Sequence, residues 1–147
     1  MASIDREAKE FSALHARMIT GLKGSFLPSE DVTPQQMITI LTISELKSCK
    51  VSIISKRMGI SPPVVTGLVD RLVSNGYVAR ARDSKDRRTV FVKLTKKGDT
   101  YVGKFRRAIQ KKWKQILVHL TEEERSAYIK IMKKLMRAIE REKAKNA

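Results

Sequence analysis

Cysteine is almost absent from this 147-residue chain, which holds only Cys49. A single cysteine excludes an intramolecular disulfide and any zinc site built from several cysteines. The two histidines, His15 and His119, do not form a recognisable metal-binding motif. We therefore expect no metal and no cofactor, and a core that is held together by packing alone.

Long apolar runs are also missing. No uninterrupted run approaches the roughly 18 apolar residues that a membrane-spanning helix needs. The opening residues, MASIDREAKEF, lack the basic and then apolar regions of a secretion signal. We expect a cytoplasmic protein that does not act on a membrane.

The motifs of the common enzyme classes are absent from the sequence. There is no glycine-rich phosphate loop, no HExxH, no nucleophile elbow and no recognisable acid/base pair. The sequence therefore predicts that the protein is not an enzyme.

Acidic residues are few beside basic ones. Lys and Arg outnumber Asp and Glu by 31 to 15, which gives a formal net charge of +16 and favours a polyanionic partner. The excess is local, because residues 80–97 hold eight basic and two acidic side chains, whereas residues 1–30 hold four of each. The terminal helix lacks the hydrophobic excess that insertion into a membrane surface requires, so nucleic acid is the favoured partner.

Amphipathic helices are predicted before the middle of the chain. The first carries apolar residues at alternating spacings of four and three and should end at Gly24 and Pro28. Its apolar positions are Ile4, Ala8, Phe11, His15, Met18 and Leu22. The second should run from Pro34 to about Leu46 with Thr33 as its cap.

Two short helices follow, joined by a tight turn. We expect Ser52 to cap the first, which runs through Met58, and Gly59 to end it in a left-handed conformation. Ser61 should cap the next helix, in which Pro62 and Pro63 occupy the first turn, where N–H groups have no partner within the helix. Ser55 is small enough to let the two helices approach closely.

The second of these helices has one apolar face. Val65, Leu68, Val69 and Leu72 should be buried, which leaves Ser61, Pro63, Val64, Thr66 and Gly67 exposed or flanking. This arrangement predicts a helix-turn-helix whose second helix suits the DNA major groove. The alternative is a plain helical hairpin.

A basic hairpin comes next. YVARAR and TVFVKL alternate in polarity and predict two antiparallel strands around the polar turn DSKDRR. Arg87 and Arg88 at the end of this wing suit a narrow minor groove, and we expect Asp86 to brace one of them. The alternative is a surface cluster of salt bridges.

Two long helices end the chain. The first should begin at Thr95, and a capping box at Thr121 and Glu124 should begin the second. Their apolar stripes are Val102, Phe105, Ile109, Trp113, Ile116 and Leu120, and then Tyr128, Met132, Leu135 and Ile139. A symmetric partner would cover such stripes, although an intramolecular bundle is the alternative. We expect residues 1–32 and 98–147 to form a helical dimerisation region around a winged helix-turn-helix in residues 33–97.

The run VSIISKRMGISPPVVTGLVDRLVSNGYVARARDSKDRRTVFVKLTKKG resembles the winged helix-turn-helix of the MarR family of transcriptional regulators. The stretch DSKDRRTVFVKLTKKG resembles the wing signature of that family. The resemblance implies a mainly α fold with a small sheet. It also implies a homodimer that binds a pseudo-palindromic operator in double-stranded DNA, usually as a repressor. Release by a small aromatic or phenolic ligand, or by cysteine oxidation, is a further implication.

The resemblance assigns DNA-binding residues position by position. Arg88 matches the family's minor-groove arginine, and Ser61 and Thr66 match the start of its recognition helix. The full candidate set is Ser61, Pro62, Pro63, Val64, Thr66, Gly67 and Arg71 on the recognition helix, Lys85, Asp86, Arg87 and Arg88 on the wing, and Lys50 and Ser52 at the DNA backbone.

Gly67 departs from the family's pattern, because many members carry Arg or another polar residue there. Glycine inside a helix costs about 1 kcal/mol relative to alanine, which indicates close packing or a close approach of the backbone to DNA. Val64 is expected either to meet a thymine methyl group or to be partly buried.

Two functional alternatives stay open in the sequence. Cys49 is a candidate redox switch, but it has no second cysteine in the chain to resolve it, and it lies outside the N-terminal position of the family's sensor cysteine. An architectural or loosely specific DNA-binding protein without an effector is the alternative to a regulator, and a small ratio of operator to random-DNA affinity would identify it.

Overall fold

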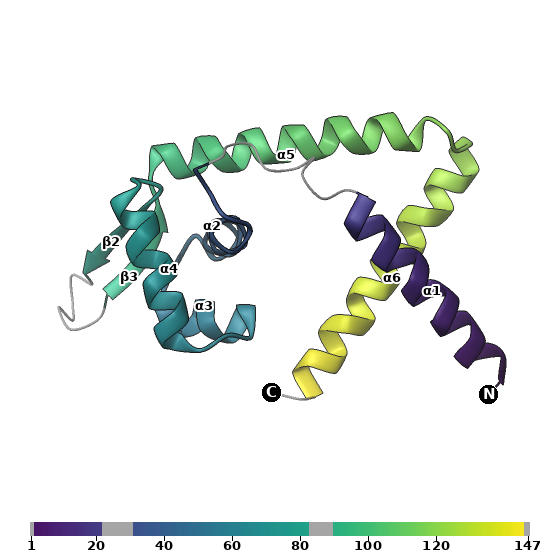
Figure 1. The fold of residues 1–147 in the computed structure, drawn as a ribbon, viewed down its shortest axis with the longest axis horizontal. Helices are drawn as coiled ribbons and strands as arrows, with labels where there is room; N and C mark the ends of the chain where they lie inside the picture. The colour runs from purple at the N-terminus through teal and green to yellow at the C-terminus, as the bar shows by residue number, and fades with distance from the viewer. Residues whose placement is uncertain (1, 22–30, 83–89, 146–147) are drawn as a thin grey trace. The chain divides into compact units, whose positions relative to one another are not determined.

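A computed structural model describes residues 2–21, 31–82 and 90–145 (Figure 1). The elements in chain order are α1 (Ala2–Gly21), α2 (Pro34–Leu46), β1 (Ser48–Cys49), α3 (Val51–Met58), α4 (Pro62–Ser74), β2 (Val78–Arg82), β3 (Val90–Leu94), α5 (Lys96–Leu117) and α6 (Glu122–Lys145). The predicted class, mainly α with a small antiparallel sheet, is confirmed. None of the helices in this described part of the chain is long and apolar enough to cross a membrane.

Helix α1 forms as the spacing of its apolar residues predicts. Most of its large apolar side chains are exposed, including Ile4 at 63%, Phe11 at 49% and Leu14 at 55%. The ring of His15 stacks on Phe11 with 3.8 Å between ring centroids. The predicted end signals, Gly24 and Pro28, lie outside the described residues.

Helix α2 begins at the predicted cap. The Thr33 hydroxyl accepts a hydrogen bond from the Gln36 N–H, and the Gln36 side chain accepts one from the Thr33 N–H, which completes a capping box. Pro34 occupies the first helical position, where its missing N–H is not needed. Ile40 and Ile43 on this helix are fully buried, so α2 forms the centre of the core.

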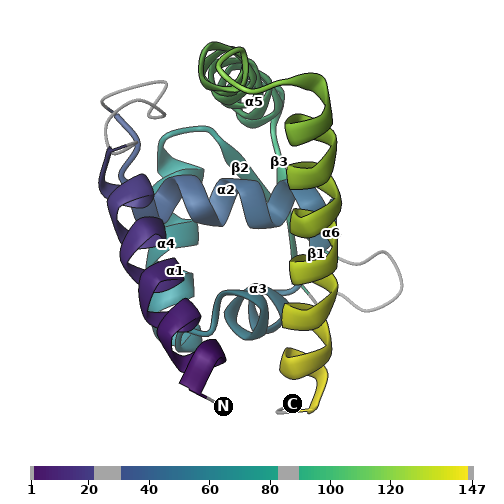
Figure 2. The same ribbon diagram turned by 90° about the vertical axis from the view of Figure 1, so that its right-hand side faces the viewer.

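The core joins α2, α3 and α4 to the sheet, and Figures 1 and 2 show these helices grouped beside the strands. Its fully buried side chains include Ile40, Ile43, Ile54, Val65, Val69, Leu72 and Val92. The same cluster includes Val32 and, from α5, Tyr101 and Val102. Because α4 has its inner face in this core, its outer face is held at a fixed orientation.

The sheet has three strands in the order β1–β3–β2, and all neighbours are antiparallel. The two strands of the hairpin were predicted. Strand β1 was not predicted, because the sequence indicates no element between Leu46 and Ser52, whereas in the structure Ser48 pairs with Lys93 and Cys49 with Val92. A two-residue strand is too short to show any alternation in its sequence.

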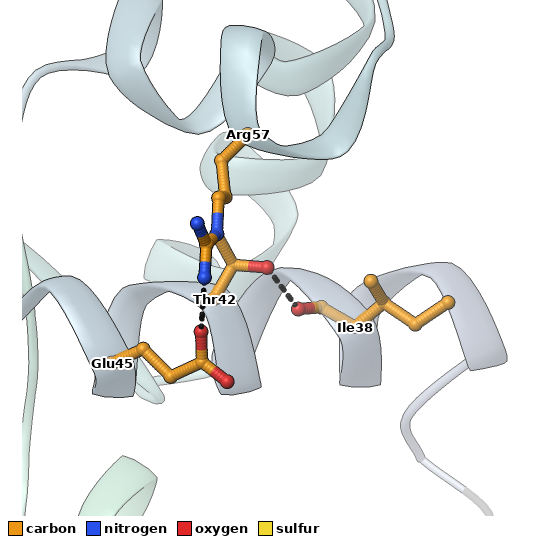
Figure 3. Close-up of polar contacts among 4 residues, drawn as sticks. All are labelled: Ile38, Thr42, Glu45 and Arg57. Carbon is orange, nitrogen blue, oxygen red and sulfur yellow. Dashed lines mark hydrogen bonds and ion pairs between the residues drawn. The ribbon is translucent and has the colours of Figure 1, made fainter. Parts of the chain in front are cut away.

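An ion pair connects α2 to α3, and Figure 3 shows it beside a hydrogen bond within α2. The Arg57 guanidinium lies 3.3 Å from the Glu45 carboxylate, and both side chains are about three-fifths exposed. Within α2, the Thr42 hydroxyl donates to the Ile38 carbonyl at 2.8 Å. An exposed ion pair of this kind contributes at most about 1 kcal/mol, so the apolar core fixes the packing of these two helices.

The C-terminal helices follow the prediction with one correction. Thr121 and Glu124 form the predicted capping box of α6, with hydrogen bonds of 2.8 and 3.3 Å. Leu120 was predicted within the preceding helix, but α5 ends at Leu117. The N–H groups of Val118, His119 and Leu120 bond carbonyls of that last turn, which closes the helix before Thr121. Residues 1–109 and 110–147 form two compact units.

Six residues connect the end of α4 to the start of α5, and we call them the α4–α5 junction. They are Asn75, Gly76, Tyr77, Thr95, Lys97 and Gly98. The Thr95 hydroxyl donates to the Gly76 carbonyl at 2.6 Å and accepts from the Gly98 N–H at 3.2 Å. The Lys97 ammonium donates to the Asn75 carbonyl at 2.7 Å and lies 4.3 Å from the centre of the Tyr77 ring.

Tyr101 of α5 packs edge-on against Tyr77, with ring centroids 5.5 Å apart. Its side chain is 3% exposed, and its hydroxyl has no hydrogen-bond partner among the described residues. Burial, followed by the nearby Tyr77, raises the pKa of Tyr101 to about 12. An unpaired buried hydroxyl costs about 1–3 kcal/mol, so the hydroxyl group of Tyr101 reduces the stability of the fold although its ring belongs to the core.

We expect Tyr101→Phe to raise the free energy of unfolding by about 1 kcal/mol at pH 7, because the unpaired hydroxyl is removed. Between pH 10 and 12 the folded protein keeps the Tyr101 proton and the unfolded chain loses it, so this residue's contribution to stability falls as pH rises. Urea unfolding of both proteins at pH 7 and above pH 10 tests this. Parallel loss of stability in the two proteins above pH 10 would contradict the assignment.

Candidate nucleic-acid interface

The α3–turn–α4 unit has the geometry of a helix-turn-helix. Gly59 ends α3 in the left-handed region, at φ 69° and ψ 30°, and its N–H donates to the Ser55 carbonyl at 2.9 Å. The buried Ser55 hydroxyl donates to the Ile60 carbonyl at 2.6 Å. The predicted turn at Gly59 and the close approach at Ser55 are confirmed, and both place α4 across α3.

Neither serine that was predicted to cap a helix forms a capping hydrogen bond. Lys50, not Ser52, is the N-cap of α3 and makes no side-chain hydrogen bond, because the helix starts directly after the strand that ends at Cys49. Ser61 is the N-cap of α4 but forms no capping bond. An N-cap oxygen normally accepts from the second or third helical N–H, and Pro63 removes the second.

The predicted division of α4 into two faces is confirmed. Val65, Leu68, Val69 and Leu72 are buried. The predicted DNA-contacting residues on this helix are all exposed: Ser61, Pro62, Pro63, Val64, Thr66, Gly67 and Arg71. Spacings of three and four place Val64, Gly67 and Arg71 on one outward face.

Some of the basic side chains near α4 form ion pairs within the protein and others do not. Arg80 of β2 pairs with Asp70 of α4 at 2.5 Å, which ties the first strand of the hairpin to the helix. Lys50 and Ser52 are exposed at the start of α3. Lys50 and Arg71 form no ion pair with other described residues, so both cations are free to meet phosphate.

The hairpin that should carry the wing is confirmed up to its turn. Strands β2 and β3 pair from Val78 with Leu94 to Arg82 with Val90. The wing residues Lys85, Asp86, Arg87 and Arg88, and with them the expected brace by Asp86, lie outside the described residues. Their roles stay predictions.

Cys49 of β1 is buried and belongs to the hydrophobic core. Burial raises the pKa of its thiol, which disfavours the reactive thiolate at neutral pH. His119 is exposed after the end of α5. Among the described residues, no group of three or more His, Cys, Asp and Glu side chains is placed to hold a metal ion.

No pattern in the sequence predicts the Asp70–Arg80 ion pair. The two residues are ten positions apart and belong to different elements, so no helical or strand period connects them. A sequence signal existed in their opposite charges on either side of the turn at Asn75 and Gly76. It became specific only once the pairing of β2 with β3 was known.

The chain is similar to known helix-turn-helix transcriptional regulators. The model of the MarR family matches residues 32–90. The HTH-type transcriptional repressor MdtR of Bacillus subtilis (strain 168) is 34% identical over 123 residues, which cover 82% of this chain and 77% of that protein.

Solved structures show the same fold. A MarR family protein from Bacillus stearothermophilus superposes with a TM-score of 0.83 at 25% identity, covering 92% of this chain and 96% of that one. Streptococcus pneumoniae FabT, solved in complex with DNA, gives a TM-score of 0.76 at 24% identity, covering 93% and 97%. With its buried α4 face, its hairpin and its similarity to MdtR over most of both sequences, the chain belongs to the MarR family of helix-turn-helix transcriptional regulators.

Proposed function

We propose that the protein is a repressor that binds a pseudo-palindromic operator in double-stranded DNA as a homodimer. The observation that carries this proposal is the outward face of α4, where Val64, Gly67 and Arg71 are exposed while the opposite face is fixed in the core. A helix held in this way suits the major groove.

The basic hairpin supports binding to DNA. Arg82 is exposed at the end of β2, and Lys85, Arg87 and Arg88 follow it in the sequence. Cations beside a reading helix release counterions from DNA phosphates and so favour association. FabT, whose fold is similar, has been solved in complex with DNA.

The uncovered apolar faces of α1 and α6 support a homodimer. Ile4, Phe11, Leu14 and Ile19 of α1 are each about half or more exposed. Ile129, Met132 and Met136 of α6 line an open apolar groove with a volume of about 400 Å³. Two symmetric copies would cover such faces and present two reading helices about one DNA turn apart.

The proposal extends to regulation and location. A small aromatic or phenolic ligand would release the protein from its operator, and this part rests on the family resemblance alone. A regulator that binds operators works where the chromosomal DNA is, so we place the protein in the cytoplasm.

The decisive experiment selects bound duplexes from a random DNA pool and titrates the winner and a scrambled control at two salt concentrations. We expect an inverted repeat that is bound about a thousandfold or more tightly than the control. Equal, steeply salt-dependent binding to both duplexes would overturn operator specificity and favour an architectural protein.

We expect Arg88→Ala to weaken operator binding by about 1–3 kcal/mol without unfolding the protein, because a wing arginine contributes contact with DNA and not core packing. Titration of the selected duplex, with circular dichroism to verify folding, measures this. Arg141→Ala removes the same charge from an exposed position on α6 outside the apolar groove and should leave affinity nearly unchanged. Equal affinities for the two variants would contradict the wing assignment.

A further inference from the structure

Gly67 lies in the interior of α4, where glycine weakens a helix relative to alanine. The sequence indicates two possible reasons for a glycine at this position: close packing within the protein, or a close approach of the helix backbone to DNA. A Cβ atom built at Gly67 meets no atom of the described residues within 4 Å. The φ angle of Gly67 is also not positive, unlike those of Gly59 and Gly76, so the backbone conformation does not require glycine. The reason for glycine at this position therefore lies outside the fold.

The surface beside Gly67 has few groups that can donate hydrogen bonds. Pro62 and Pro63 have no N–H, and the Thr66 hydroxyl already donates to the Pro62 carbonyl at 2.9 Å. Val64 is 49% exposed and is one helical turn from Gly67. The first half of α4 therefore presents a mostly apolar outward surface, with the exposed Ser61 hydroxyl at its N-terminus and Arg71 as the charged group farther along the same face.

An apolar reading surface suits one feature of the major groove. Adenine, guanine and cytosine present polar edges there, whereas thymine adds a methyl group at C5. A valine side chain covers such a methyl without needing a hydrogen bond. A residue without a side chain, one turn away, lets the helix backbone come closer to the base pairs.

We propose that the first half of α4 recognises thymine methyl groups, with Val64 as the contacting side chain and Gly67 as the point of closest approach to the base pairs. This inference rests on the proposed binding of an operator and names the chemistry of the half-site. It makes Val64 and Gly67 determinants of specificity, and Arg71 a contact with the phosphate backbone beyond them.

Deoxyuridine substitution tests the contact with the methyl group. Each thymine of the selected operator is replaced in turn by deoxyuridine, which lacks only the C5 methyl. We expect at least one position in each half-site where wild-type affinity falls about fourfold, as for one methyl group left in water. In Val64→Ala the same replacement should have no further effect. Val118→Ala, the same substitution at another exposed valine, should keep the full response.

Gly67→Ala tests the close approach through two changes of opposite sign. The variant should raise the melting temperature by about 3 °C at a fixed protein concentration, because alanine favours the helix. It should also weaken operator binding about tenfold, as for one mismatched base pair. Gly103→Ala is the matched control, since Gly103 is also inside a helix and a Cβ there first meets the flexible end of the Arg107 side chain at 3.4 Å, and its affinity should not change.

The outcomes separate this inference from the proposed function. Equal affinity of the wild type for selected and scrambled duplexes would overturn both. Specific binding that ignores the loss of every thymine methyl, or that survives Gly67→Ala unchanged, would overturn the inference and leave the operator-binding function in place.

Discussion

Replacing Gly98 by alanine is expected to lower the free energy of unfolding by about 3 kcal/mol, well beyond the roughly 1 kcal/mol that alanine adds to helix propensity. A Cβ atom at this position would overlap the backbone carbonyl oxygen of Tyr77 and come within 3.3 Å of two carbons of the Leu94 side chain. The Tyr77 carbonyl cannot simply move away, because it accepts the Thr95 N–H at 3.0 Å. The added methyl must therefore displace the start of α5 and loosen the α4–α5 junction.

Urea unfolding followed by helical circular dichroism, at one protein concentration for all variants, measures this loss. Gly103→Ala is the control on the same helix, because a Cβ there first meets the flexible end of Arg107 at 3.4 Å. That variant should be as stable as the wild type or slightly more stable. A Gly98→Ala protein with wild-type stability would mean that α5 does not lie against Tyr77 as described.

Phe11→Asp is expected to produce a monomer and to weaken operator binding about a hundredfold or more, because each half-site would then be bound without the other. Phe11 lies on the exposed apolar face of α1 between Ile4 and Leu14. A face of this kind is typical of an interface between proteins. Burying a carboxylate at the centre of such an interface costs more than the remaining contacts return.

Light scattering after size exclusion and titration of the selected duplex test this expectation together. Ala13→Asp introduces the same carboxylate on the opposite face of α1, and it costs more helix propensity than Phe11→Asp because alanine is the best helix former. It should remain a dimer and bind the operator normally. If Phe11→Asp stayed dimeric, α1 would be excluded from the dimer interface.

Local patterns predicted most of the fold because they are set by neighbours in the sequence. Pro34 with Thr33, and Thr121 with Glu124, mark helix starts through hydrogen bonds that span only three residues. Gly59 marks a helix end through its own backbone conformation. The pairing of Ser48 and Cys49 with β3 escaped prediction because its partners are more than forty residues away in the chain.

The sequence predicted which residues of the candidate site are exposed, but not which hydrogen bonds their side chains form. The 3.6-residue period identified which face of α4 is buried, and the outward residues followed from that. The serine caps failed because Pro63 removes an N–H that Ser61 would have used, and because α3 begins directly after β1. The open space beside Gly67 depends on where all the neighbouring elements pack, so it cannot be predicted from a local sequence pattern.

The open space at Gly67 also bears on how the protein can evolve. Most substitutions on a binding surface are limited by the stability they cost, because natural proteins lie only slightly above the threshold that folding requires. At position 67 that limit is relaxed, since a longer side chain enters open space and the helix gains stability. Selection for a new operator can therefore try residues there freely, and the stability gained offsets a damaging change elsewhere in the chain.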